Sequence, residues 1–174
     1  RLITGNNEAD VRLIGAQRLL TVGTDESAQR LVGVLQGNPA DLAAQIAVCQ
    51  AVADLGRKVP QLAEPLLALL GDQRPGLGDA LTRALRRFDD GGVVDRLQAI
   101  AARSDTAIEN REAAVRVLGE MGENMNAVAA LVRLAGDGTG GLRQAALMAF
   151  EQATGTVHPD AASARAWWDA HQSL

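Results

Sequence analysis

The sequence predicts an all-α protein, an α-solenoid of about five helix–turn–helix repeats followed by a C-terminal capping helix. The first observation is a 33-residue period, because Gly23, Gly56, Asp89, Gly122 and Gly155 each close an apolar stretch rich in Ala and Leu. Gly and Asp tolerate positive φ, so each is expected to end a helix in the left-handed conformation. The second observation is composition: the chain is 47% hydrophobic, only 2% aromatic, and shows no alternating strand pattern. Caps at one period indicate stacked helical units.

The 174 residues are expected to form one domain. The predicted repeats are 7–37, 38–72, 73–104, 105–137 and 138–155, with the cap at 156–174. Residues 1–5 read as the tail of a preceding element. Because the chain starts at Arg1 rather than Met, we expect it to be a fragment of a longer protein.

The first repeat pairs a helix over roughly 8–22 with a helix over roughly 25–36 capped by Thr24 or Asp25. A Gly37-Asn38-Pro39 turn follows, with Pro39 suited to the first position of the next helix. The apolar positions at helical spacing are Val11, Ile14, Leu19 and Val22 in the first helix and Ala28, Leu31, Val32 and Leu35 in the second.

The second repeat pairs 40–55 with a helix that ends at Leu70 and either begins near Glu64 or is kinked at Pro65. The third repeat departs most from the pattern. Pro75, Gly76 and Gly78 shorten its first helix to about 79–88, and the second helix is expected over 93–103.

The fourth repeat pairs 107–121 with 125–135. A glycine-rich turn at 136–141 leads into a last repeat helix that runs to Ala153. The tail from Pro159 to about Gln172 is predicted to form one closing helix.

Two stretches carry a recognisable motif. One runs Val11-Arg12-Leu-Ile-Gly-Ala16 to Gly23, and the other runs Asn110-Arg111-Glu-Ala-Ala to Leu118-Gly119. This pattern resembles the HEAT repeat family, particularly the short HEAT-like repeats of the phycobilisome-lyase type, over roughly residues 7–155. The absence of Tyr and of a Thr-Pro-Leu-His turn disfavours the tetratricopeptide and ankyrin repeats.

The resemblance implies a right-handed superhelix in which the second helix of each repeat lines the concave face. The ending, Ala153-Thr-Gly155 followed by Trp167-Trp168, is also similar to the close of some multi-repeat bacterial HEAT proteins.

Arg12, Gln45, Arg111 and Gln144 share one phase of the repeat. We expect this ladder to bond backbone carbonyls or acidic side chains between repeats, as such ladders usually do in HEAT-like arrays. A ligand-binding ladder is the alternative.

The candidate catalytic motifs are incomplete. The glycines of 136–141 fit G-x-G-x-x-G, but no strand precedes or follows them, so we interpret the segment as a turn. A metal site can be drawn from His158 and His171 with Asp160 and Asp169, and Ser163 lies nearby for a triad. HEAT-like metal hydroxylases use His-Glu pairs, which are missing here.

Cys49, the only cysteine, lies in an apolar stretch and is expected to be buried. We therefore predict no catalytic residue, cofactor or metal site, and no enzyme activity within this segment.

The Arg83, Arg86 and Arg87 cluster precedes Asp89 and Asp90. Local neutralisation is the simpler interpretation, and an anion site for a partner is the alternative.

Adjacent helical residues point about 100° apart. One residue of the Trp167-Trp168 pair is therefore expected to seal the last repeat, and the other points outward. Whether the pair only caps the array or also binds a partner is left open.

The implied concave face is rich in Gln and mildly basic. The sequence therefore predicts a non-catalytic interaction scaffold that binds a polar or weakly acidic peptide or protein. The candidate partner-binding residues are Gln29, Arg30, Arg96, Gln98, Arg133 and Trp168.

A HEAT-like lyase or hydroxylase subunit and a nucleic-acid-binding HEAT module are the alternatives. The net charge of −4 argues against nucleic acid. No apolar run is long enough for a membrane span. Localisation and oligomeric state are left open, with a monomer favoured.

Overall fold

The computed structural model describes residues 9–37 and 41–172, and these contain ten α-helices, one short 3₁₀ helix and no strand. The all-α prediction is confirmed. The expected preceding element at 1–5, the Asn38-Pro39 turn and the helix starts at Glu8 and Ala40 lie outside the described residues.

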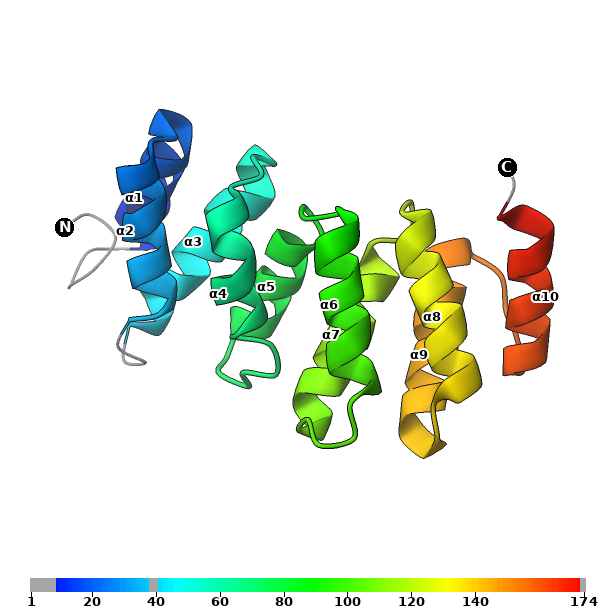
Figure 1. The fold of residues 1–174 in the computed structure, drawn as a ribbon. Coiled ribbons are helices and arrows are strands. Elements are labelled where there is room, and N and C mark those ends of the chain that lie inside the picture. Colours follow the sequence, from blue (N-terminus) through cyan, green and yellow to red (C-terminus); the bar gives the residue numbers. More distant parts are fainter. Residues whose placement is uncertain (1–8, 38–40, 173–174) are drawn as a thin grey trace. The chain divides into compact units, whose positions relative to one another are not determined.

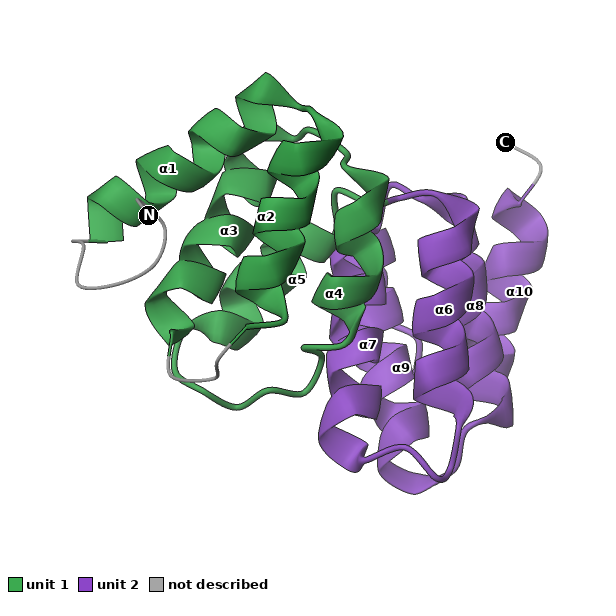
Figure 2. Ribbon diagram, turned by 60° about the vertical axis from the view of Figure 1, so that its left-hand side comes forward, with its two compact units in different colours: residues 1–88 green, residues 89–174 purple. Residues whose placement is uncertain are grey.

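The chain divides into two compact units, residues 1–88 (unit 1) and 89–174 (unit 2), coloured separately in Figure 2. The boundary falls inside the third predicted repeat, and the single domain over 1–174 stays a prediction. The helices of unit 1 are α1 (Ala9–Val22), α2 (Asp25–Leu35), α3 (Leu42–Leu55), the 3₁₀ helix η1 (Pro60–Leu62), α4 (Ala63–Leu67) and α5 (Leu77–Leu85). Those of unit 2 are α6 (Gly91–Ala102), α7 (Ile108–Glu120), α8 (Met125–Asp137), α9 (Gly140–Thr154) and α10 (Ala161–His171).

Each unit has two layers of helices (Figure 1). In unit 1, α3 packs between α1 and α5, while α2 contacts α1, α3, η1 and α4. In unit 2, α7 packs against α9, while α8 packs between α6 and α10. Within unit 1 we call α1, α3 and α5 the first-helix layer and α2, η1 and α4 the second-helix layer; within unit 2 the first-helix layer is α7 and α9, and the second-helix layer is α6, α8 and α10.

Small aliphatic side chains fill both cores, as the composition predicts. Each unit buries one phenylalanine, Phe88 in unit 1 and Phe150 in unit 2, among Leu, Val and Ala. Cys49 is fully buried in α3, which confirms its predicted place.

Helix starts follow the expected capping chemistry. The Thr24 hydroxyl accepts a hydrogen bond from the Ser27 N–H at 3.2 Å, so Thr24 rather than Asp25 caps α2. The side chains of Asp41, Asp90, Asn124 and Asp160 cap α3, α6, α8 and α10 in the same way.

The 33-residue glycine period has two different physical causes. Gly23, Gly56 and Gly155 have φ of +66°, +60° and +70°, which confirms left-handed C-caps at these three positions. The prediction is wrong for Asp89 and Gly122, since no described non-Gly residue has positive φ and Gly122 is not among the positive-φ glycines.

At Gly122 the requirement is space. A Cβ there would stand 2.8 Å from the backbone Cα and O of Ala153, because α9 passes directly over this turn. The glycine is therefore needed for the close packing of α7 against α9, and not for a left-handed backbone conformation.

Several predicted helix limits also need correction. The second helix of the second repeat ends at Leu67, not Leu70, because the next residues form i to i+3 bonds such as Leu70 N–H to Leu67 O. The first helix of the third repeat runs Leu77–Leu85 rather than 79–88, starting after the left-handed Gly76. The turn predicted at 136–141 is shorter, because α8 continues to Asp137 and α9 begins at Gly140.

The apolar face predicted for α1 is wrong in part. Ile14 and Val22 are 48% and 64% exposed, whereas Ala16 and Leu20 are buried. Among the described helices α1 packs mainly against α2 and α3, and the side of the helix that faces them is the covered one. In α2 the predicted face is largely buried, with Ala28, Leu31 and Leu35 in the core.

Candidate interaction surface

The predicted partner-binding residues all lie in the second-helix layer, divided between the two units. Gln29 and Arg30 are on α2 of unit 1; Arg96 and Gln98 are on α6 of unit 2. Arg133 and Trp168 lie on α8 and α10, also in unit 2.

In unit 1, the exposed Arg30 forms an ion pair with Glu26 one helical turn earlier, at 2.7 Å. Exposed pairs of this kind contribute only a few tenths of a kcal/mol. Arg30 therefore remains available to a partner, but its charge is already partly compensated. Gln29, beside it, is exposed.

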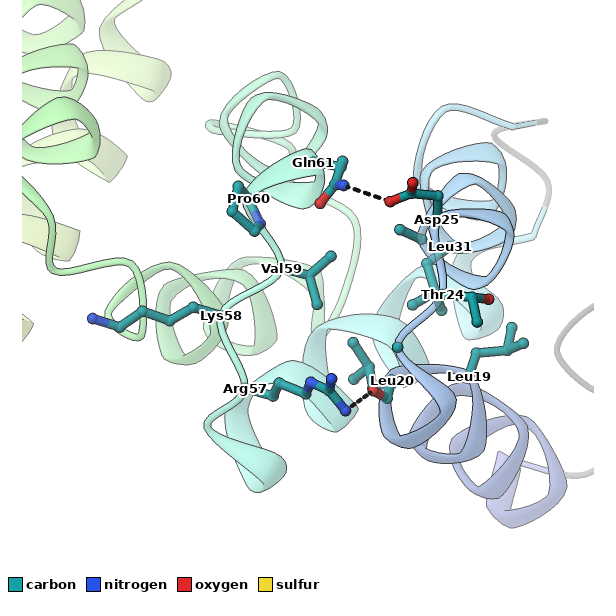
Figure 3. A pocket seen from close by; sticks show the side chains of 12 residues that line it. Leu19, Leu20, Thr24, Asp25, Leu31, Arg57, Lys58, Val59, Pro60 and Gln61 are labelled. Carbon is teal, nitrogen blue, oxygen red and sulfur yellow. Dashed lines mark hydrogen bonds between the residues drawn. The ribbon is translucent and has the colours of Figure 1, made fainter.

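A second link in unit 1 joins the neighbouring members of this layer. The Gln61 side chain on η1 donates to the Asp25 carboxylate on α2 at 3.4 Å (Figure 3). Asp25 lies in the first turn of α2, where a negative charge also opposes the helix dipole.

A pocket of about 120 Å³ lies between the α1–α2 turn and the segment that leads into η1 (Figure 3). Leu20, Leu31 and Val59 give it an apolar lining, and the hydrogen-bonded pair Gln61 and Asp25 also lines it. Lys58 belongs to the lining residues, but its side chain points away from the other labelled ones in Figure 3.

In unit 2, the structure brings two predicted residues together. The Arg133 guanidinium on α8 donates to the Gln98 amide oxygen on α6 at 3.3 Å. Both Arg96 and Arg133 are exposed, while Gln98 is half-buried. Of the predicted set, Gln98 and Arg133 are therefore the two residues in contact, across α6 and α8.

The two tryptophans have different surroundings. The Trp167 ring packs edge-on against the buried Phe150 ring at a centroid distance of 5.4 Å and stacks on His171 at 4.2 Å. Trp168, on the next position of α10, is half-buried. Trp167 therefore anchors α10 to the core, which leaves Trp168 as the residue free for another role.

The predicted ladder is built from side-chain bonds to backbone at two positions. Gln45 donates to Leu35 O at 2.8 Å, and Arg111 donates to Ala101 O at 2.9 Å. Each acceptor lies ten residues upstream, near the end of the previous helix, so the ladder joins successive repeats. Arg12 lies 3.8 Å from the Asp41 carboxylate.

Gln144, the last member, departs from the ladder because it is exposed. Gln45 and Arg111 bond backbone carbonyls and Arg12 lies beside an acidic side chain, which are the partners that the structural interpretation of the ladder predicts.

A polar network extends from Gln45. Arg74 donates to the Gln45 amide oxygen at 2.8 Å and to the Asp72 carboxylate at 2.7 Å. The hydrogen bond from Arg74 lowers the pKa of Asp72 below its usual value. Gln45 is only 2% exposed, so this network satisfies a buried amide and fixes the 72–74 turn.

Two further arginines form contacts between repeats that the sequence did not reveal. Arg57 donates to Leu20 O and Thr21 O, both at 2.9 Å, and Arg87 donates to Ala53 O at 2.9 Å. These carbonyls lie in the last turns of α1 and α3, where a positive charge also opposes the helix dipole.

The sequence contains only a weak signal for the Arg57 contact, namely that Arg57 directly follows Gly56, one of the glycines of the 33-residue period. In the structure, a Cβ on Gly23 would meet the Arg57 guanidinium. The predicted neutralisation of Arg87 by the following aspartates does not describe its main contact, which is with the Ala53 carbonyl.

The residues from which a metal site could be drawn have structural contacts. Asp160 accepts from the Ser163 N–H at 2.8 Å in a reciprocal capping box, and this bond lowers the pKa of Asp160. Asp169 pairs with Arg165 at 3.1 Å. Within the described residues, no three His, Cys, Asp or Glu side chains are grouped as metal ligands.

No protein-family model matches the chain, and no curated protein is similar to it at a significant level. Within the part of the chain that the structure covers, no helix has the length and apolar character needed to cross a bilayer.

Proposed function

We propose that the chain is a HEAT-like α-solenoid of the phycobilisome-lyase type and acts as a non-catalytic protein-interaction scaffold. Three features support the repeat assignment: the helix pairs, the left-handed glycines at 23, 56 and 155, and the two-layer packing in each unit. The bonds from Gln45 and Arg111 to carbonyls ten residues upstream also repeat between equivalent helices.

The binding surface in this proposal is the second-helix layer of each unit, taken separately. The observation that carries it is the Gln98–Arg133 pair, which presents an amide and a guanidinium on neighbouring helices at the surface. Such groups match backbone carbonyls and carboxylates of a polar or weakly acidic partner. Arginine is also enriched among residues that dominate protein interfaces.

A non-catalytic role is supported by the structural contacts of the Asp, Ser, His and Cys side chains that could otherwise take part in catalysis. Asp160 and Ser163 cap α10, and His171 stacks on Trp167. Cys49 is buried, and burial raises the pKa of its thiol to about 12, far above the range in which a thiolate nucleophile forms.

A matched pair of charge reversals tests the surface. The test variant changes Arg30, Arg96 and Arg133 to Glu in the intact chain, and partners are captured from lysate of the source cell by cross-linking. The control variant changes Arg18, Arg116 and Arg143 to Glu; these arginines are exposed on α1, α7 and α9 of the first-helix layer.

Both variants change the net charge equally. We expect the test variant to lose the partners that the control variant retains. Equal capture by both would show that the second-helix layer is not the binding surface. Equal loss by both would point to a dependence on net charge alone.

A further inference from the structure

Arg133 differs from Arg30 and Arg165, which also lie on second-layer helices, in the partner it contacts. Arg30 pairs with Glu26, and Arg165 pairs with Asp169. Arg133 instead contacts the neutral amide of Gln98, and among the described residues no carboxylate forms an ion pair with it. An exposed guanidinium without an ion pair suits a group that binds a carboxylate of a partner.

Trp168 presents a second unsatisfied group in the same unit. The packing of Trp167 against Phe150 fixes the rotation of α10, so Trp168 points in a different direction and stays half-buried. Within the described residues, its indole N–H has no hydrogen-bond acceptor. A tryptophan with an exposed ring surface and a free N–H is typical of an interface anchor.

The register of the helices relates these residues. Gln98, Arg133 and Trp168 follow one another at steps of 35 residues, on α6, α8 and α10. The first step brings two side chains into contact, and α10 packs against α8 as α6 does. We name these three residues the unit 2 row.

The distance between neighbouring residues of the row determines how many peptide residues separate the groups that bind them. Packed helices lie about 8–10 Å apart, and an extended peptide rises about 3.3 Å per residue, so neighbouring members of the row are separated by about three peptide residues. Resting on the proposed function, we propose that unit 2 binds an extended peptide that places an Asp or Glu carboxylate on Arg133. About three positions away, an aromatic or branched aliphatic side chain of the peptide packs on Trp168, and the Gln98 amide bonds the peptide backbone.

A peptide fits this surface better than a nucleic acid does. Asp95, Asp137 and Asp169 lie on the same three helices and are exposed, so a polyanion would meet repeated negative charge. A single carboxylate at Arg133 avoids this repulsion.

Selection from a random 12-residue peptide display library on the intact chain tests the spacing. We expect enriched peptides to share an acidic residue about three positions from a large apolar one. The best peptide is then measured by fluorescence polarisation. Changing its acidic residue to the amide should weaken binding about tenfold, the loss expected for one charge-assisted hydrogen bond.

The variants Arg133→Gln and Trp168→Ala should each weaken that peptide about tenfold. The control Arg165→Gln, on the same layer but already ion-paired, should change binding less than twofold. All three side chains are at least partly exposed, and a circular dichroism melt confirms that each variant is folded.

Two results would overturn the inference while leaving the scaffold proposal intact: enriched peptides without the spaced pair, or peptides insensitive to both Arg133→Gln and Trp168→Ala. Failure to enrich any peptide would also overturn it. Displacement of the peptide by a 12-nucleotide single strand, lost in Arg133→Gln, would assign the row to nucleic acid instead. The scaffold proposal is tested separately, by the triple charge reversal and its matched control.

Discussion

Replacing Gly122 by alanine tests whether the glycine period is set by backbone conformation or by packing. A Cβ at this position would stand 2.8 Å from the Cα and O atoms of Ala153. Those atoms belong to the backbone of α9, so they cannot rotate away as a flexible side chain would. To reach an ordinary contact, α9 and the α7–α8 turn must separate by about half an ångström.

The magnitude follows from this comparison. Forcing one extra methyl into a packed interface costs about 1–3 kcal/mol, and we expect Gly122→Ala in the upper part of that range because the obstacle is backbone. Gly155→Ala should cost about 1–2 kcal/mol for another reason, since Gly155 has φ +70° but open space around it.

Urea unfolding followed by tryptophan fluorescence is a suitable assay, because both tryptophans lie in unit 2 with these glycines. Gly136→Ala is the matched control. Gly136 lies in the last turns of α8 with nothing near its Cβ position, so alanine should stabilise unit 2 by up to about 1 kcal/mol.

A neutral or stabilising Gly122→Ala would show that close packing does not require glycine at this position. Equal destabilisation by Gly122→Ala and Gly122→Ser would show the same, because the larger serine side chain must meet the Ala153 backbone more severely.

Three further predictions concern unit 1. Arg57→Ala removes the two carbonyl bonds at the end of α1 and should lower the free energy of unfolding by about 1–2 kcal/mol, measured by circular dichroism in urea; an unchanged midpoint would contradict this. Because Arg74 lowers the pKa of Asp72 in the folded state, the unfolded state binds more protons at this carboxyl. The stabilisation of the folded state by the Asp72–Arg74 pair is therefore present above the unfolded pKa of about 3.9 and is lost as the pH falls through the folded pKa. The stability difference between wild type and Asp72→Asn should therefore narrow at low pH, and a difference that widens would be inconsistent with the ion pair. Cys49, with its thiol pKa raised to about 12 by burial, should react with a thiol reagent only after urea unfolding; rapid labelling of the native protein would disprove its burial.

The helices could be predicted from the sequence because their signals are local. Capping side chains at Thr24 and Asp160 and the left-handed glycines at Gly56 and Gly155 act within a few residues of the helix end. Local chemistry of this kind is visible in a sequence window.

The wrong predictions concern features that are determined by contacts between residues distant in sequence. Glycine at 122 looks the same as glycine at 155, and only the passage of α9 over the turn distinguishes them. The exposure of Ile14 likewise depends on which sides of α1 have a neighbouring helix, and periodicity alone does not contain that information.

The candidate surface was predictable in part. Gln98 and Arg133 were assigned to one face because the HEAT resemblance implies that second helices share a face, and the structure brings the two side chains into contact. The bond from Arg57 to the end of α1 spans 37 residues to Leu20, so no local pattern indicates it. Pairing of Arg30 with Glu26 follows from i, i+4 spacing and could have been foreseen.

Hydrogen–deuterium exchange of the intact chain, with and without a captured partner, locates the surface that the partner covers. A partner that binds the second-helix layer should slow exchange in α6 and α8 and leave the ends of α7 and α9 unchanged. Slower exchange confined to α7 and α9, with α6 and α8 unaffected, would contradict the assignment of the binding surface.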